Sequence, residues 1–120
     1  MTESLVQLTQ ITLATTHTAE MVKFYDTIFG TELQPTEAYG TTLYNGTLAG
    51  IPLTICPNEI AGVQAEQSCH KLGFRAADLI AILSRVEVAG GSIEAPLTDD
   101  PLAQAILRDP DGNTIEVMQA

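Results

Sequence analysis

The feature of this sequence best suited to chemistry is a carboxylate in the middle of a predicted strand. The segment Arg108-Asp109-Pro110-Asp111-Gly112-Asn113 runs directly into Thr114-Ile115-Glu116-Val117-Met118. The first segment predicts a turn, because it joins capping aspartates to a proline of fixed φ and a Gly-Asn pair that tolerates positive φ. The second predicts a strand in which Ile115 and Val117 point to one side and Thr114, Glu116 and Met118 to the other. Burial of Glu116 would be unfavourable by several kcal/mol unless a cation lies nearby.

Hydrophobic periodicity predicts one strand, one helix and three further strands in the first half of the chain. Alternation predicts a half-buried strand over 5–14, with a phase change near Thr9 and Gln10. The helix is expected to begin around Thr16-His17-Thr18 and to end at Gly30, because its apolar residues recur at steps of three and four. The three further extended segments are expected over 33–37, 41–48 and 51–56.

The same order is predicted to recur after a polar connector over 57–69. A strand over 71–76 is followed by a helix that Asp78 opens and Gly90-Gly91 closes, and then by strands over 92–97, 102–109 and 113–119. Leu13 and Phe74 are 61 residues apart. Each half is too small to bury its own sheet, so we predict modules over 1–56 and 70–120 that share one core and one cavity in a single domain.

Composition restricts the class of partner. The chain has 120 residues and a formal net charge of −10, which argues against nucleic acid because phosphate binding needs a cationic face. No apolar run is long enough to span a membrane, and the first residues do not resemble a secretory signal, so we expect no membrane association and a cytoplasmic protein. Cys56 and Cys69 fit no disulfide framework or CxxC pair, and we expect both to be reduced.

The chain resembles the vicinal oxygen chelate superfamily, which includes glyoxalase I, extradiol dioxygenases, fosfomycin resistance enzymes and bleomycin resistance proteins. The resemblance rests on the quoted turn and strand at 108–118, on Leu72-Gly73-Phe74-Arg75-Ala76-Ala77-Asp78-Leu79, and on Thr12-Leu13 with the helix segment Met21-Val22-Lys23-Phe24-Tyr25. It implies an α+β fold in which two βαβββ modules form an open, barrel-like sheet around a ligand cavity. Relatives commonly form dimers by pairing or exchanging modules, so the resemblance also implies a homodimer.

Enzymes of this family bind one divalent metal through side chains on four strands. Carried over by position, those sites fall on Gln10, Thr54, Lys71 and Glu116, and only Glu116 matches the family strongly. A protonated lysine has no lone pair to offer and would repel a metal ion. We therefore expect no cofactor and a Lys71 ammonium opposite Glu116. In the alternative, a divalent metal binds Glu116 with Gln10 or His70, the latter through a one-residue slip of its strand.

Alternation places further residues on the implied cavity face. Thr12, Gly73, Arg75 and Met118 share it with the positions above. Arg75 is expected either to form a salt bridge at the rim or to clamp a carboxylate or phosphate group of a ligand.

Four other residues carry weaker expectations. His17 is expected to cap the helix or to be exposed, and Tyr39 and Tyr44 either line the mouth of the cavity or pack on strands. Cys56 has no neighbouring base in sequence that would activate its thiol.

Three functions from different classes remain at this point. The first is metal-free binding of a small molecule, similar to bleomycin resistance proteins, with Gln10, Thr12, Thr54, Lys71, Arg75, Glu116 and Met118 as the ligand-binding residues. The aromatic content of 5% and the absence of tryptophan fit poorly with stacking of flat drug rings. The alternative is a metal-dependent lyase, isomerase or dioxygenase. The third is metal-free catalysis with Glu116 as base and Lys71 stabilising an oxyanion.

Overall fold

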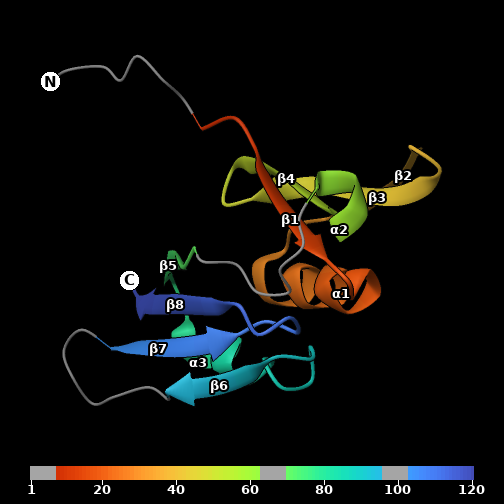
Figure 1. The fold of residues 1–120 in the computed structure, drawn as a ribbon. Coiled ribbons are helices and arrows are strands. Elements are labelled where there is room, and N and C mark those ends of the chain that lie inside the picture. The colour runs from red at the N-terminus through yellow and green to blue at the C-terminus, as the bar shows by residue number, and fades with distance from the viewer. Residues whose placement is uncertain (1–7, 63–69, 96–102) are drawn as a thin grey trace, which may run out of the picture.

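The two halves of the chain form two four-stranded sheets with one helix between them. The computed structural model describes residues 8–62, 70–95 and 103–120. Sheet A has the strand order β1-β4-β3-β2 and sheet B the order β5-β8-β7-β6, and Figure 1 shows helix α1 between them. The two orders are equivalent, which confirms the predicted pair of βαβββ modules. In each sheet the first strand of the module pairs in parallel with the last, and the remaining pairs are antiparallel.

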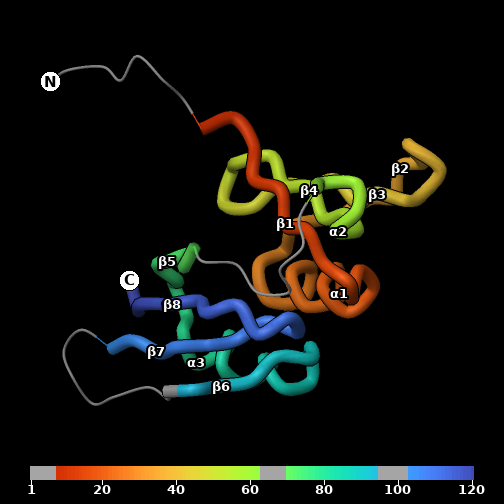
Figure 2. Tube along the Cα trace, in the orientation of Figure 1, coloured from red at the N-terminus to blue at the C-terminus, as the bar shows by residue number. Residues whose placement is uncertain are grey.

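The elements follow one another in both halves as predicted, as the trace in Figure 2 shows. The first half consists of β1 (Ile11–Thr15), α1 (Thr18–Phe29), β2 (Gln34–Ala38), β3 (Thr41–Leu48) and β4 (Ile51–Pro57). The connector contains the short helix α2 (Asn58–Ala61). The second half consists of β5 (Leu72–Ala76), α3 (Leu79–Leu83), β6 (Ser92–Ala95), β7 (Gln104–Arg108) and β8 (Thr114–Gln119). None of the helices in the described ranges combines the length and apolar character needed to cross a membrane.

Two predicted boundaries were wrong, those of the first strand and of the second helix. The first strand begins at Ile11, and residues 8–10 precede it without regular structure, although part of the predicted range lies outside the described residues. The connector is not entirely irregular, because it forms α2. The second helix ends at Leu83, well before Gly90, and the chain continues through turns that still bury Val86. Val86 is thus buried at helical spacing from the apolar residues of α3, although its backbone forms a turn and not a helix.

The helix ends show which capping predictions were correct. Gly30 ends α1 in the left-handed conformation, and its backbone N–H donates to the carbonyl of Asp26. Asp78 caps α3, because its side chain accepts a hydrogen bond from the N–H of Ala81. His17 occupies the N-cap of α1 but makes no capping bond with its side chain; instead its backbone N–H donates to the hydroxyl of Thr15 at 2.8 Å. A strand residue thus satisfies a donor at the start of the helix.

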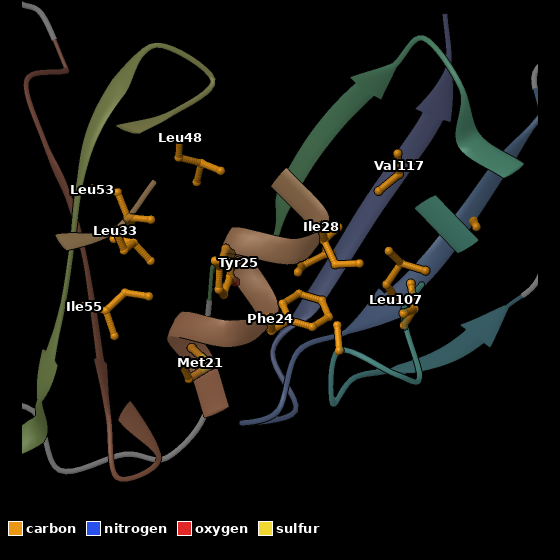
Figure 3. Close-up of a cluster of buried hydrophobic side chains, with 14 of the residues drawn as sticks. Met21, Phe24, Tyr25, Ile28, Leu33, Leu48, Leu53, Ile55, Leu107 and Val117 are labelled. Atoms are coloured by element: carbon orange, nitrogen blue, oxygen red, sulfur yellow. The ribbon is translucent and has the colours of Figure 1, made fainter. Parts of the chain in front are cut away.

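The hydrophobic core lies on both sides of α1, as Figure 3 shows. Buried residues of this helix contact the apolar face of sheet A and the apolar face of sheet B. The residues labelled in this core are Met21, Phe24, Tyr25 and Ile28 of α1, Leu33, Leu48, Leu53 and Ile55 on the side of sheet A, and Leu107 and Val117 on the side of sheet B. The rings of Phe29 and Phe74 also stack, with their centroids 4.4 Å apart. One helix therefore joins both modules.

Candidate functional site

A hollow of about 250 Å³ lies on the polar face of sheet B. Gly73, Phe74, Arg75, Glu116 and Met118 line it. Neighbouring strands place four of these residues side by side, because Gly73 pairs with Glu116 and Arg75 pairs with Met118 in the parallel β5–β8 register. The alternation predicted for both strands is therefore confirmed, and it gathers two charged side chains around a glycine.

Lys71 and Glu116 form an ion pair at the edge of this hollow. Lys71 Nζ lies 3.2 Å from Glu116 Oε2, so the lysine does lie opposite the carboxylate. The side chains are 53% and 29% exposed, respectively. Glu116 is therefore only partly buried, and the carboxylate has both the predicted cation and some solvent beside it.

Arg75 is an exposed cation on the same face. It forms no ion pair or hydrogen bond with any residue in the described ranges, so the salt bridge considered for it is not found there. Its guanidinium N–H donors, which no described residue engages, lie beside the Lys71–Glu116 pair.

The polar face of sheet A carries a row of neutral hydrogen-bonding groups. The Thr54 hydroxyl donates to Asn45 Oδ1 at 2.8 Å, and Asn45 Nδ2 donates to the Thr36 hydroxyl at 3.2 Å. On β1, which pairs with β4 at Thr12 and Thr54, the Gln10 amide donates to the Thr12 hydroxyl at 2.9 Å. We did not predict Asn45. Alternation along 41–48 could have placed it on the face of Thr54, but only the sheet register shows the two in contact.

Within a single chain, the polar face of sheet A and the polar face of sheet B do not meet. Because α1 fills the space between the apolar faces, the faces that carry Thr54 and Glu116 are turned away from the helix and hence from each other. The hollow around Glu116 accordingly includes none of Gln10, Thr12 and Thr54. The predicted ligand-binding residues thus form one neutral group on sheet A and one charged group on sheet B.

A second cavity, of about 320 Å³, lies where β1 approaches the beginnings of β5 and β8. Its lining is mostly apolar and consists of Leu8, Gln10, Ile11, Thr12, Leu13, Tyr25, His70, Leu72, Asn113, Thr114 and Ile115. Gln10 and His70 lie here and not in the hollow of Glu116. The slip considered for His70 is not adopted, because Leu72 pairs with Ile115 and packs on the core.

No metal-binding cluster is formed within the described residues. They contain no group of three or more His, Cys, Asp or Glu side chains arranged to hold a metal ion. The donor set suggested for the alternative, Glu116 with Gln10 or His70, is divided between two separate hollows.

The remaining candidates lie away from both hollows. Tyr39 is 81% exposed in the turn after β2, and Tyr44 is partly buried against the core, and neither lines either of the two hollows described above. Cys56 is buried, and burial raises the pKa of its thiol. His17 is half-exposed, and its Nδ1 lies 2.9 Å from Asp111 Oδ1.

A buried polar contact joins the two modules, and we did not predict it. The Tyr25 hydroxyl in α1 donates to Asp109 Oδ2 in the turn between β7 and β8. Burial raises the pKa of Asp109, while four hydrogen bonds to its carboxylate act in the opposite direction. Burial and then the charge of Asp109 raise the pKa of Tyr25 well above its usual value. The apolar periodicity of the helix predicted only that Tyr25 is a core residue, and it gave no indication of a hydrogen bond from its hydroxyl.

Comparisons with known proteins give a family and a fold. Residues 7–117 match the model of the Glyoxalase/Bleomycin resistance protein/Dioxygenase superfamily. Among solved structures, a glyoxalase-related enzyme from Fulvimarina pelagi has a TM-score of 0.75 at 21% identity, covering 97% of this chain and 89% of that one. No curated protein matches the sequence.

Two further similar structures are of an antibiotic binding protein and of a fosfomycin resistance protein. TnmS3, an antibiotic binding protein from Streptomyces sp. CB03234, has a TM-score of 0.69 at 19% identity and covers 98% of each chain. The fosfomycin resistance protein FosX from Mesorhizobium loti has a TM-score of 0.68 at 17% identity, covering 100% of this chain and 94% of that one. At these sequence identities, the similarity shows a shared fold alone.

Proposed function

Because the chain belongs to the glyoxalase/bleomycin resistance protein/dioxygenase superfamily, we propose that it binds a small organic molecule in the hollow of sheet B without a metal ion. The observation that carries this proposal is the contact between Lys71 Nζ and Glu116 Oε2 at 3.2 Å. Glu116 is the one carboxylate that matches the family's metal-binding pattern, and the Lys71 ammonium lies directly beside it. It satisfies the carboxylate by hydrogen bonding and repels a second cation.

The donor set supports the same proposal. Transition-metal sites in proteins generally take three or more ligands from the chain. Around Glu116, the other lining residues are a glycine, a phenylalanine, an arginine and a methionine, of which only the thioether is even a soft ligand. That one relative of this fold is an antibiotic binding protein agrees with a binding role.

We further propose that a homodimer completes the site. Each chain exposes a neutral polar face on sheet A and a charged polar face on sheet B, and ligand cavities are normally enclosed on several sides. If sheet A of one copy covers sheet B of another, Thr54 of the partner subunit would face Glu116. Light scattering that gives the mass of one chain across the micromolar range would contradict this arrangement.

Metal binding tests the main proposal directly. We expect wild-type protein, stripped with chelator and titrated with Mn²⁺ or Zn²⁺, to show no stoichiometric binding by calorimetry. Lys71→His replaces the ammonium with the side chain common in the family and should gain measurable affinity. The control is Lys71→His combined with Glu116→Gln, which should lose that gain. A wild-type protein that binds one equivalent, and loses it in Glu116→Gln alone, would favour a metal-dependent lyase, isomerase or dioxygenase.

The same ion pair supports a second candidate, metal-free catalysis. Glu116 would act as base and Lys71 would stabilise a developing oxyanion, since Glu116 lines the hollow and the Lys71 ammonium lies 3.2 Å from its carboxylate. Substrate turnover in the wild type that is lost in Glu116→Gln, with ligand affinity retained, would support it. Binding without turnover of any tested compound would leave the binding role alone.

A further inference from the structure

Gly73 lies within strand β5 and has no local reason to be glycine. Of the nine glycines in the sequence, six have positive φ, namely Gly30, Gly40, Gly50, Gly62, Gly90 and Gly112. Gly46 and Gly91 are required by packing, because a Cβ at either position would overlap a neighbouring backbone oxygen. Gly73 has neither property, and nothing lies within 4 Å of the position its Cβ would take.

A glycine of this kind indicates that something else approaches the backbone. Glycine within a strand weakens the strand, by about 0.5–1 kcal/mol relative to alanine, and often marks the close approach of a ligand. The space above Gly73 belongs to the hollow formed with Arg75, Glu116 and Met118. The charged side chains around this space therefore indicate which charge a ligand bound there would carry.

The net charge of Lys71, Arg75 and Glu116 is positive, whereas the net charge of the whole chain is −10. The sequence has five lysines and arginines against fifteen acidic residues, yet Lys71 and Arg75 flank Gly73 at alternate positions. Lys71 is engaged by Glu116. Arg75 has no partner in the described part of the chain, so one positive charge is left over on this face.

We propose that Gly73 and Arg75, with the Lys71–Glu116 pair, form a subsite for a small organic carboxylate. This inference rests on the proposed binding function and adds the charge of the ligand to it. The guanidinium of Arg75 binds the carboxylate through its parallel N–H donors. The body of the ligand lies over Gly73 and against Met118, and Glu116 accepts a hydrogen bond from any neighbouring donor. Arg75 is the one cation of this hollow without a partner among the described residues, and its single charge matches a carboxylate better than a doubly charged phosphate.

Three probes that share one apolar body test the charge preference: phenylacetate, phenylacetamide and phenethylamine. Each is titrated into the full chain and followed by two-dimensional amide NMR, which reports the affinity and the residues affected. We expect phenylacetate to perturb the amides of β5 and β8 and to bind about tenfold more tightly than the amide, which corresponds to about 1.4 kcal/mol. Phenethylamine should bind more weakly than either.

Variants identify the groups responsible. Arg75→Gln should remove the advantage of phenylacetate over phenylacetamide, while Arg85→Gln, the same change at an exposed arginine outside the hollow, should retain it. Gly73→Val fills the space over the strand and should abolish binding of both compounds.

The other possible results separate failure of the carboxylate subsite from failure of the proposed binding function. Stronger binding of phenethylamine, an advantage that survives Arg75→Gln, or no shift with any probe would overturn the carboxylate subsite. Binding of the neutral or cationic probe at β5 and β8 would still retain the proposed function. If a wider set of neutral, cationic and anionic compounds also failed to perturb these strands, the proposed function itself would fail.

Discussion

The hydroxyl of Tyr25 in α1 donates a buried hydrogen bond to Oδ2 of Asp109, directly after β7, with the two oxygens 2.9 Å apart. The same carboxylate accepts hydrogen bonds from the backbone N–H groups of Asp111 and Asn113 and from the Asn113 side-chain amide. One acid therefore holds the turn before β8 in shape and fixes the first module's helix to it. The position of Glu116 and the docking of the modules depend on this turn.

Tyr25→Phe removes the donor and leaves the rest of the ring in place. We expect a loss of about 1–3 kcal/mol in the free energy of unfolding, because a buried acceptor loses a partner. Urea denaturation measures it. Tyr39→Phe is the matched control, since Tyr39 is 81% exposed and its change should fall within about 0.5 kcal/mol. Equal effects of the two variants would show that the inter-module bond contributes nothing.

The stability of the protein should respond to the protonation of Asp109. Burial raises its pKa above the ordinary 3.8, so the folded state holds the proton at pH values where the unfolded state has released it. This contribution is complete below pH 3.8 and is lost as pH rises through the folded pKa.

Asp109→Asn lacks this titration. The stability advantage of the wild type over Asp109→Asn should therefore shrink as pH rises from about 4 towards neutrality, measured by urea denaturation at several pH values. An advantage that grows with pH would mean that the four hydrogen bonds outweigh burial and lower the pKa instead.

Alkaline pH should destabilise the protein through Tyr25. Its pKa is raised well above 10.0, by burial first and by Asp109 second, so the unfolded chain ionises before the folded one. Stability is then lost as pH rises beyond 10.0 towards the folded pKa. The stability of Tyr25→Phe should fall less steeply over that range than that of Tyr39→Phe. Parallel curves for the two variants would contradict the raised pKa.

Alanine at two glycines should give opposite results. Gly91→Ala places a Cβ against the Arg108 carbonyl oxygen and 2.5 Å from the Phe24 ring, and we expect a loss of about 1–3 kcal/mol. Gly73→Ala meets nothing within 4 Å and should leave stability unchanged or raise it by up to about 1 kcal/mol. Thermal unfolding measures both. A large loss in Gly73→Ala would show a packing role that the structure does not contain.

The Lys71–Glu116 pair should contribute little to stability despite its place in the candidate site. The two side chains are 53% and 29% exposed, and ion pairs in solvent are worth about 0–1 kcal/mol. Lys71→Met should therefore lower the free energy of unfolding by less than about 1 kcal/mol in low salt, with the difference reduced further in high salt. A loss of several kcal/mol would contradict this prediction and show that the ion pair is desolvated in solution.

Local patterns determined the order of the elements and the faces of the strands. The period of two placed Gly73 and Arg75 on one face of β5 and Glu116 on the face of β8 opposite Ile115 and Val117, because side-chain direction along a strand depends only on the backbone. The pairing of Gly73 with Glu116 then shows that these two faces coincide. Gly30 and Asp78 marked helix ends for the same local reason, since caps satisfy backbone groups of neighbouring residues. The end of α3 was predicted incorrectly because Val86 is buried by tertiary packing, and burial alone does not require a helix.

The tertiary structure alone decided how the two modules face each other. Alternation assigns Thr54 and Glu116 to polar faces, but it does not say which apolar face packs on which element. Docking of α1 against both sheets turned those polar faces outwards, and this arrangement depends on burying apolar surface between residues distant in sequence. The bond from Tyr25 to Asp109 is of the same kind, because its two ends are 84 residues apart and no local pattern links them.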